Sequence, residues 1–482
     1  MSFISFEFLI ALPVAALIYY LIPARYRYLW ICALSLAFYA TQGVRLLVVM
    51  MLSIVSTYAA GMCVRVRTSG GGSKGTVTHI PLIVGVIFNV ALILVFKYTG
   101  MFFPAAGERL IDAGLFAPIG LSFYVLQAAG YVIDCYRGDI EPEKNFFLYA
   151  AFVSFFPLVI SGPIERAPKM IPQLKDPKGF DYDTVRDGLL MMVWGFFLKL
   201  VLADRIAILV NTAYASPASY AGGMMMLSVL LYSVQIYCDF MGYSYIAAGT
   251  ARALGFGVID NFDAPYLSET IADFWRRWHR SLSFWFRDYL YIPLGGSKQG
   301  TWKKIRNLLI IFAVSGLWHG AAWRFVLWGL VHGLYQVAGC VRVNASSGGV
   351  KGTLTHFSAR LFRKMRTFFL VSFAWIFFRA EDMDKVGAVV RSMFIPRIHQ
   401  LLDGTLVQMG LDTPNVVLMF LAIAVLVCAD ILRDCGVRLL EALPKQGTWL
   451  RWSVYIAAIV LIVICGVWGE GYDASSFIYA QF

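Results

Sequence analysis

Apolar residues run along this chain in stretches about as long as a membrane is thick. A run of roughly 20 apolar residues is the length that a helix needs to cross the hydrocarbon core. Several runs are short or interrupted by Gly or Pro, so the pattern predicts about eleven true crossings, with re-entrant and interfacial pieces, in an all-α, multi-pass bundle. The candidate spans are residues 4–22, 28–42, 46–63, 80–99, 117–134, 145–161, 185–210, 223–240, 305–319, 322–341, 367–380, 414–432 and 451–468.

The composition strengthens this interpretation. Of the 482 residues, 59% are hydrophobic and 15% are charged, and the mean hydropathy is +0.68. A soluble protein would carry about a quarter charged residues. The first run, Met1 to Leu21, lacks a basic leader region and a small-residue cleavage site, so we expect a retained helix. We predict one transmembrane domain over 1–482.

The net charge of +12 orients the chain and does not indicate nucleic-acid binding. The basic residues gather in loops after residue 63, at 298–306 and at 342–366. By the positive-inside rule these loops face the cytoplasm, which places the N-terminus outside. The eight cysteines are scattered and none forms a Cys-x-x-Cys pair, so neither a disulfide framework nor a metal site is expected.

A polar segment interrupts the apolar pattern between residues 271 and 290. At 100° per residue it predicts one interfacial helix whose opposite face carries tryptophans, Trp278 among them, with His279 on the border. The arginines could simply meet lipid phosphates, or they could form with Trp278 a docking surface for an anionic acyl donor; the pattern allows both. The polar stripe consists of Arg276, Arg280, Ser283 and Arg287.

A histidine lies deep in the next predicted helix, which spans 305–320. His319 follows Trp318 and stands twelve residues beyond Asn307, about 18 Å along the helix axis. A histidine about halfway through an apolar core of about 30 Å is costly unless it lines a polar path. Gly316 and Gly320 leave room beside it for a substrate or for another backbone. For His332, on the following span, we expect a structural interhelical hydrogen bond.

His319 is therefore the candidate for chemistry. A neutral imidazole can take the proton of a hydroxyl that attacks a thioester, because its reference pKa lies near working pH. This reaction needs no metal and no bound cofactor beyond the acyl donor. The chain contains no Gly-x-Ser-x-Gly elbow, no His-Glu-x-x-His and no P-loop.

Several motifs resemble those of the membrane-bound O-acyltransferase family, and within it the bacterial branch that acetylates alginate. The resemblance spans nearly the whole chain, and its central motifs are the most specific. The matching stretches are 119–124 (IGLSFY), 161–166 (SGPIER), 239–244 (DFMGYS), 273–283 (DFWRRWHRSLS), 286–296 (FRDYLYIPLGG) and 316–321 (GLWHGA).

The resemblance implies a fold, a site and partners. It implies a helical funnel with a thin central layer, a catalytic core within 117–341, His319 as catalytic residue and His279 as a second active-site position, with Asp239, Ser283 and Trp318 lining the site. It also implies acetyl-CoA as cytoplasmic donor, transfer across the bacterial inner membrane, a periplasmic partner of the SGNH-hydrolase type, and polysaccharide synthesis and export machinery.

Two other functions remain open from the sequence. One is D-alanyl transfer to teichoic acid from a carrier-protein thioester, because that branch shares the central motif. The other is transport, because buried histidines also mark proton paths. Transporters commonly contain paired repeats with broken helices, whereas this chain repeats only a short loop phrase, at 71–79 and 348–356.

Overall fold

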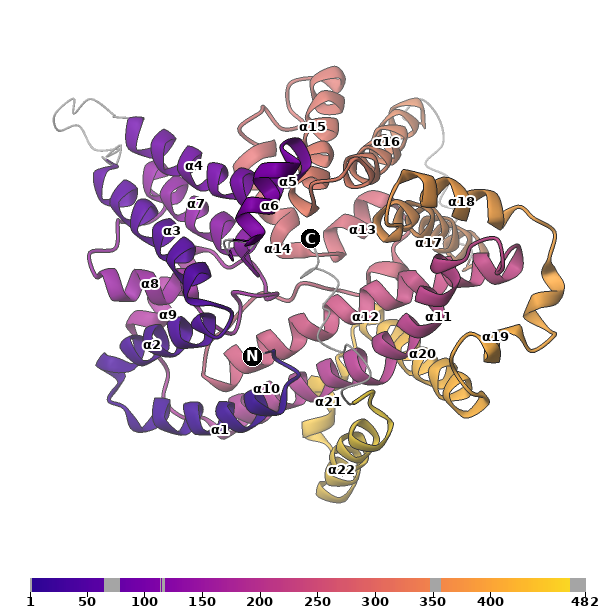
Figure 1. The fold of residues 1–482 in the computed structure, drawn as a ribbon. Coiled ribbons are helices and arrows are strands. Elements are labelled where there is room, and N and C mark those ends of the chain that lie inside the picture. Colours follow the sequence, from indigo (N-terminus) through magenta and orange to yellow (C-terminus); the bar gives the residue numbers. More distant parts are fainter. Residues whose placement is uncertain (1, 65–78, 113, 115–117, 347–356, 469–482) are drawn as a thin grey trace. The chain divides into compact units, whose positions relative to one another are not determined.

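The computed structural model describes residues 2–64, 79–112, 114, 118–346 and 357–468. All regular elements within these ranges are helical, which confirms the predicted all-α class (Figure 1). The chain forms two compact units, one mainly from residues 1–192 and 244–259 and the other from 193–243 and from 260 onward. Helices α10 (Tyr182–Phe196) and α12 (Gly223–Ala253) each contribute to both.

Buried polar side chains join the helices of the first unit. Ser53 donates to the Asn89 side chain over 2.5 Å, and Tyr149 donates to the Thr57 hydroxyl over 2.7 Å. Such hydrogen bonds stabilise helix–helix contacts in a membrane bundle. Burial of apolar side chains contributes little there, because the surrounding lipid is as apolar as the helix surface. The helices are α1 (Phe6–Leu21), α2 (Arg27–Ala40), α3 (Val44–Cys63), α4 (Ile80–Ile93), α5 (Thr99–Phe102), α6 (Pro104–Asp112), α7 (Leu121–Arg137), α8 (Phe146–Ser154) and α9 (Ala167–Lys175).

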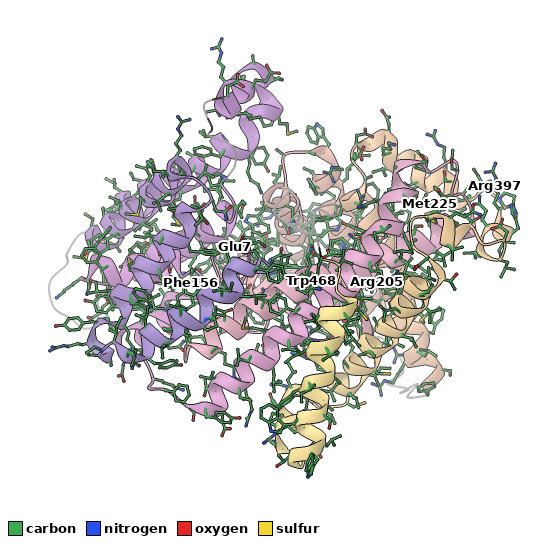
Figure 2. The ribbon with its side chains drawn as sticks, turned by 60° about the horizontal axis from the view of Figure 1, so that its bottom comes forward. Glu7, Phe156, Arg205, Met225, Arg397 and Trp468 are labelled. Carbon is green, nitrogen blue, oxygen red and sulfur yellow. The ribbon has the colours of Figure 1, made fainter. Side chains whose placement is uncertain are left out.

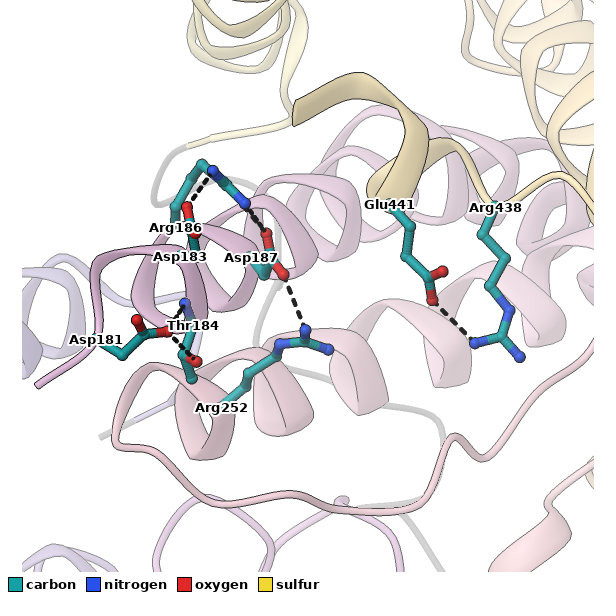
Figure 3. Close-up of polar contacts among 8 residues, drawn as sticks. All are labelled: Asp181, Asp183, Thr184, Arg186, Asp187, Arg252, Arg438 and Glu441. Carbon is teal, nitrogen blue, oxygen red and sulfur yellow. Dashed lines mark hydrogen bonds and ion pairs between the residues drawn. The ribbon is translucent and has the colours of Figure 1, made fainter. Parts of the chain in front are cut away.

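The start of α10 is held by carboxylates (Figure 3). The Asp181 carboxylate accepts the Thr184 backbone N–H over 2.8 Å, which satisfies a donor of the first turn. Asp187 pairs with Arg252 over 2.8 Å and so links α10 to the end of α12. The charged side chains at the start of α10 and at the end of α12 therefore have ion-pair partners.

The second unit contains the remaining helices. Arg205 (Figure 2) lies on α11; its guanidinium donates to the Cys465 carbonyl over 2.7 Å and to Asn415 over 3.0 Å, so it ties α22 and α20 to α11. The helices are α11 (Asp204–Ala215), α13 (Ile271–Arg277), α14 (Arg280–Phe286), α15 (Thr301–His319), α16 (Trp323–Ser346), α17 (Phe357–Arg379), α18 (Met383–Met393), α19 (Thr405–Gln408), α20 (Thr413–Asp434), α21 (Leu439–Ala442) and α22 (Thr448–Cys465).

Among the described residues, five helices are long and apolar enough to cross a membrane: 44–63, 80–102, 223–253, 413–434 and 448–465. The count of about eleven crossings stays a prediction. The span expected over 145–161 is wrong in extent, because α8 ends at Ser154 and is only nine residues long. Pro157 follows shortly, and a proline disfavours helical backbone in the residue before it.

The single helix expected over 271–290 is also wrong. Helix α13 ends at Arg277, Trp278 is extended, and α14 begins after His279, whose backbone is left-handed at φ 43° and ψ 54°. A π-helical turn, Arg287–Tyr291, continues α14. No Gly or Pro forces the break, so its cause lies in contacts with other segments.

Glu269, just before α13, contacts the start of α17. Burial alone would raise the pKa of this carboxyl, but hydrogen bonds from Arg363 over 2.7 Å and Arg360 over 3.1 Å lower it below the usual value. The lowered folded-state pKa means that the contact stabilises the protein above the unfolded-state pKa and loses its effect as pH falls through the folded-state value.

We therefore expect Glu269→Gln to lower the unfolding free energy by about 0.5–1 kcal/mol at pH 7. The difference in melting temperature between this variant and the parent in detergent should shrink as pH falls below about 4. A difference that is constant from pH 7 to pH 3 would contradict the ion-pair explanation.

Candidate active site

His319 is the last residue of α15 and lies in an aromatic box. Its side chain is buried at 3% exposure, and its ring centroid is 4.8 Å from that of Trp318, 4.9 Å from Trp328 and 5.3 Å from Phe378. These rings come from α15, α16 and α17, so three helices meet at the predicted catalytic residue.

Close packing of α15 against α16 fixes where His319 lies (Figure 1). A Cβ added to Gly316 would overlap the Phe325 carbonyl, and one added to Gly329 would overlap the Phe312 carbonyl. A Cβ on Gly320 would overlap the Phe325 ring. The flanking glycines are expected to leave room for a substrate or for another backbone. These contacts show the approach of another backbone and of a side chain.

His279 is buried at 1% exposure, between α13 and α14. Its ring packs edge-on to Phe240 of α12 at 4.7 Å and lies 6.1 Å from Trp318. Trp318 therefore contacts both histidines that the sequence singles out. Left-handed backbone is costly for residues other than glycine and often occurs at functional sites; Ala264 and His279 adopt it within the described part of the chain.

His332 has the structural role expected of it. The Trp275 indole N–H donates to His332 Nδ1 over 3.3 Å, which joins α13 to α16. The His332 ring lies 5.2 Å from the Trp328 ring, which also contacts His319. Because an indole nitrogen only donates, His332 Nδ1 is the acceptor and the ring accepts this bond as neutral imidazole.

The predicted basic stripe is divided among α13, α14 and the π-helical turn that follows α14. Arg276 is on α13, 72% exposed and 3.9 Å from Asp273. Arg280 and Arg287 flank one aromatic ring, with their guanidinium carbons 5.8 Å and 4.9 Å from the Phe284 centroid. Arg287, 55% exposed, also pairs with Asp288 over 2.6 Å. The structure thus brings Arg280 and Arg287 to one ring, whereas Arg276 lies on the preceding helix.

The sequence pattern suggests that Trp278 contributes to a docking surface, but in the structure it does not. It is 1% exposed, and its ring packs against Phe262 at 5.1 Å and Trp375 at 5.1 Å. The break after Arg277 turns this side chain into the core. Ser283, also expected at the site, directs its hydroxyl to the Trp278 carbonyl over 3.4 Å.

Asp239, another predicted site residue, belongs to a buried ion cluster. Lys199 Nζ lies 2.6 Å from Asp239 and 2.7 Å from Asp204, and all three side chains are at most 7% exposed. Lys199 lies in the π-helical turn Phe197–Ala203 that joins α10 to α11. Asp239 directly precedes Phe240, the residue against which His279 packs.

Sequence reasoning missed Lys199, Asp204 and the aromatic residues Trp328, Trp375 and Phe378. A signal existed for the first two, since lysine and aspartate inside an apolar run of 185–210 are rare and usually paired. No sequence signal distinguishes the aromatic residues from ordinary core side chains. Within the described residues, no group of His, Cys, Asp and Glu side chains could hold a metal ion.

Within the described residues, an all-helical fold with membrane-length helices and two histidines that contact one tryptophan defines a polytopic membrane protein with groups suited to proton transfer. A model of the membrane-bound O-acyltransferase family matches residues 143–343. The chain belongs to this family and is an O-acyltransferase.

Relatives with known names support the same class. A probable alginate O-acetylase of Azotobacter vinelandii is 33% identical over 446 residues, 90% of this chain and 85% of the relative. A peptidoglycan O-acetyltransferase of Helicobacter pylori is 32% identical over 417 residues, 79% and 77% of the two chains. A teichoic acid D-alanyltransferase of Bacillus subtilis is 28% identical over 225 residues, 44% and 56%.

Proposed function

We propose that this protein takes an acetyl group from cytoplasmic acetyl-CoA and passes it across the bacterial inner membrane for O-acetylation of an exported, alginate-like polysaccharide. The single observation that carries the chemical part is that the buried side chains of His279 and His319 both contact Trp318, in the second unit. The choice of acetyl transfer is supported by the alginate O-acetylase relative, which matches along most of both chains.

In the proposed reaction His319 is the general base. The acceptor hydroxyl oxygen bonds to the thioester carbonyl carbon while its proton moves to His319. The carbon–sulfur bond then breaks, and the same proton passes to the leaving coenzyme A thiolate, so the enzyme ends unchanged. His279 assists by orienting the donor or by a second proton transfer. A periplasmic SGNH-type protein and the polysaccharide export machinery are the proposed partners.

The arginines on α13, on α14 and at the start of the following π-helical turn are the proposed docking site for the donor's phosphates. Arg280 and Arg287 converge on Phe284, and Arg276 is largely exposed. Guanidinium groups suit phosphate because they present several donors in a planar fork. With Trp278 in the core, the docking site consists of these three arginines.

Incubation of the purified protein with labelled acetyl-CoA or with a D-alanyl-charged carrier protein, each with a soluble acceptor, tests the donor. We expect label transfer from acetyl-CoA and none from the carrier. Replacement of Arg280 and Arg287 by Ala should raise the KM for acetyl-CoA about tenfold or more. The control is Arg438→Ala, an exposed arginine paired with Glu441 at 2.9 Å (Figure 3). Transfer from the D-alanyl carrier alone would overturn the proposal in favour of teichoic acid modification.

A further inference from the structure

Asn261 lies beside the chain break that positions His279. It is in the segment between α12 and α13, and its side chain is 2% exposed. The Asn261 backbone carbonyl accepts the Arg280 N–H over 2.9 Å, and its side-chain oxygen accepts the Ser281 N–H over 3.3 Å. One residue therefore satisfies the first two backbone donors after His279.

These donors belong to the first turn of α14, where a helix leaves its N–H groups without partners of its own. The residue before a helix usually supplies a side-chain oxygen for them. His279 occupies that position but makes no capping bond. Because Asn261 caps α14 from another segment, the His279 imidazole is not required for capping.

The same segment also holds the chain on the other side of His279. The Asp263 N–H donates to the Arg277 carbonyl over 3.0 Å, so 261–263 contacts the backbone both before and after the Trp278–His279 pair. Asp263 is fixed in turn by Arg433 of α20 over 2.8 Å. The segment 261–263 is thus anchored to a long helix and can impose the left-handed backbone of His279.

We propose that Asn261 is a positioning residue for His279. By capping α14 instead of the His279 side chain, Asn261 holds the imidazole edge-on to Phe240 and beside Trp318. This inference rests on the proposed function, in which His279 takes part in acyl transfer. Asn261 itself touches neither donor nor acceptor in this assignment, and its removal should alter the turnover step more than donor binding.

The test combines histidine footprinting with kinetics on the full-length protein in detergent. Diethyl pyrocarbonate modifies accessible neutral imidazoles, and peptide mass spectrometry resolves the rate at each histidine. For Asn261→Ala we expect His279 to be modified about tenfold faster and kcat to fall about 10–100-fold, with the KM for acetyl-CoA within about twofold. Asn261→Asp keeps an oxygen acceptor for Ser281 and should restore both values toward those of the parent.

Asn89→Ala is the matched control, since Asn89 is a fully buried asparagine of the first unit that bonds Ser53 and Gly85. It should change neither the His279 rate nor kcat per folded molecule. If Asn261→Ala does not accumulate, Asn261→Ser shortens the side chain and carries the same expectation with smaller effects.

Unchanged modification of His279 in the Asn261 variants, or an equal rise in Asn89→Ala, would overturn the positioning role. Faster modification with unchanged kcat would support the positioning role and overturn the part of His279 in the proposed function. The two ideas therefore fail by different measurements.

Discussion

Replacement of His319 by alanine is expected to lower acyl transfer about 10³-fold or more, because the proposed mechanism then has no base for the acceptor hydroxyl. His319→Gln, which keeps a polar side chain of similar size, should be nearly as inactive because an amide does not take up a proton at neutral pH. Transfer of labelled acetyl from acetyl-CoA to acceptor by purified protein measures the loss.

His332→Gln is the matched control for His319. Both histidines are buried and contact Trp328, but His332 accepts a hydrogen bond from Trp275 and is assigned no chemical role. Loss of that bond should cost about 1 kcal/mol of stability and leave kcat within about fivefold. If His319→Gln and His332→Gln lost activity equally, disruption of the aromatic cluster would explain the loss and His319 would have no special role.

The sequence predicts the helix that carries His319 well. The expected range of 305–320 differs from α15 by a few residues at its start, and Trp318 contacts both histidines. This helix is predictable because its extent follows from local sequence alone, an apolar run of membrane length that ends at Gly320. The glycines at 316 and 320 indicate a close approach by a substrate or by another backbone, but do not distinguish the two.

The surroundings of His279 were not predictable in the same way. The arginines at 276, 280 and 287 repeat with helical spacing, and no proline or glycine intervenes. Asn261 and Asp263 hydrogen-bond to the backbone on both sides of the break, and they lie about 15 to 20 residues earlier in the chain, so only tertiary contacts bring them there. Helical periodicity therefore misplaced Trp278, whose ring lies in the core.

The ion cluster shows a different limit of sequence reading. Lys199 and Asp204 are five residues apart, a spacing that does not place two side chains together on an α-helix. The π-helical turn at 197–203 widens the helix locally, and the two groups meet at 2.7 Å. Asp239 then completes the cluster from α12. Rare π turns leave no reliable pattern in a single sequence.

Lys199→Met should be the most destabilising of the substitutions considered for this protein. It leaves the Asp204 and Asp239 carboxylates buried next to each other without the ammonium group that lies 2.7 Å and 2.6 Å from them. Removal of one member of a buried ionic group costs about 3–5 kcal/mol, because the remaining charges stay desolvated. The folded fraction after heating, followed by size-exclusion chromatography in detergent, measures the effect.

Two further variants identify charge as the cause. Arg252→Met removes a partly exposed partner of Asp187, at 44% exposure, and should cost at most about 1 kcal/mol. The triple variant Lys199→Met, Asp204→Asn, Asp239→Asn carries no charge at this position and should regain most of the lost stability. A triple variant as unstable as Lys199→Met would mean that packing around the π turn, and not charge, sets the cost. Since Asp239 adjoins Phe240, recovery of stability without recovery of kcat would place the ion cluster among the supports of His279.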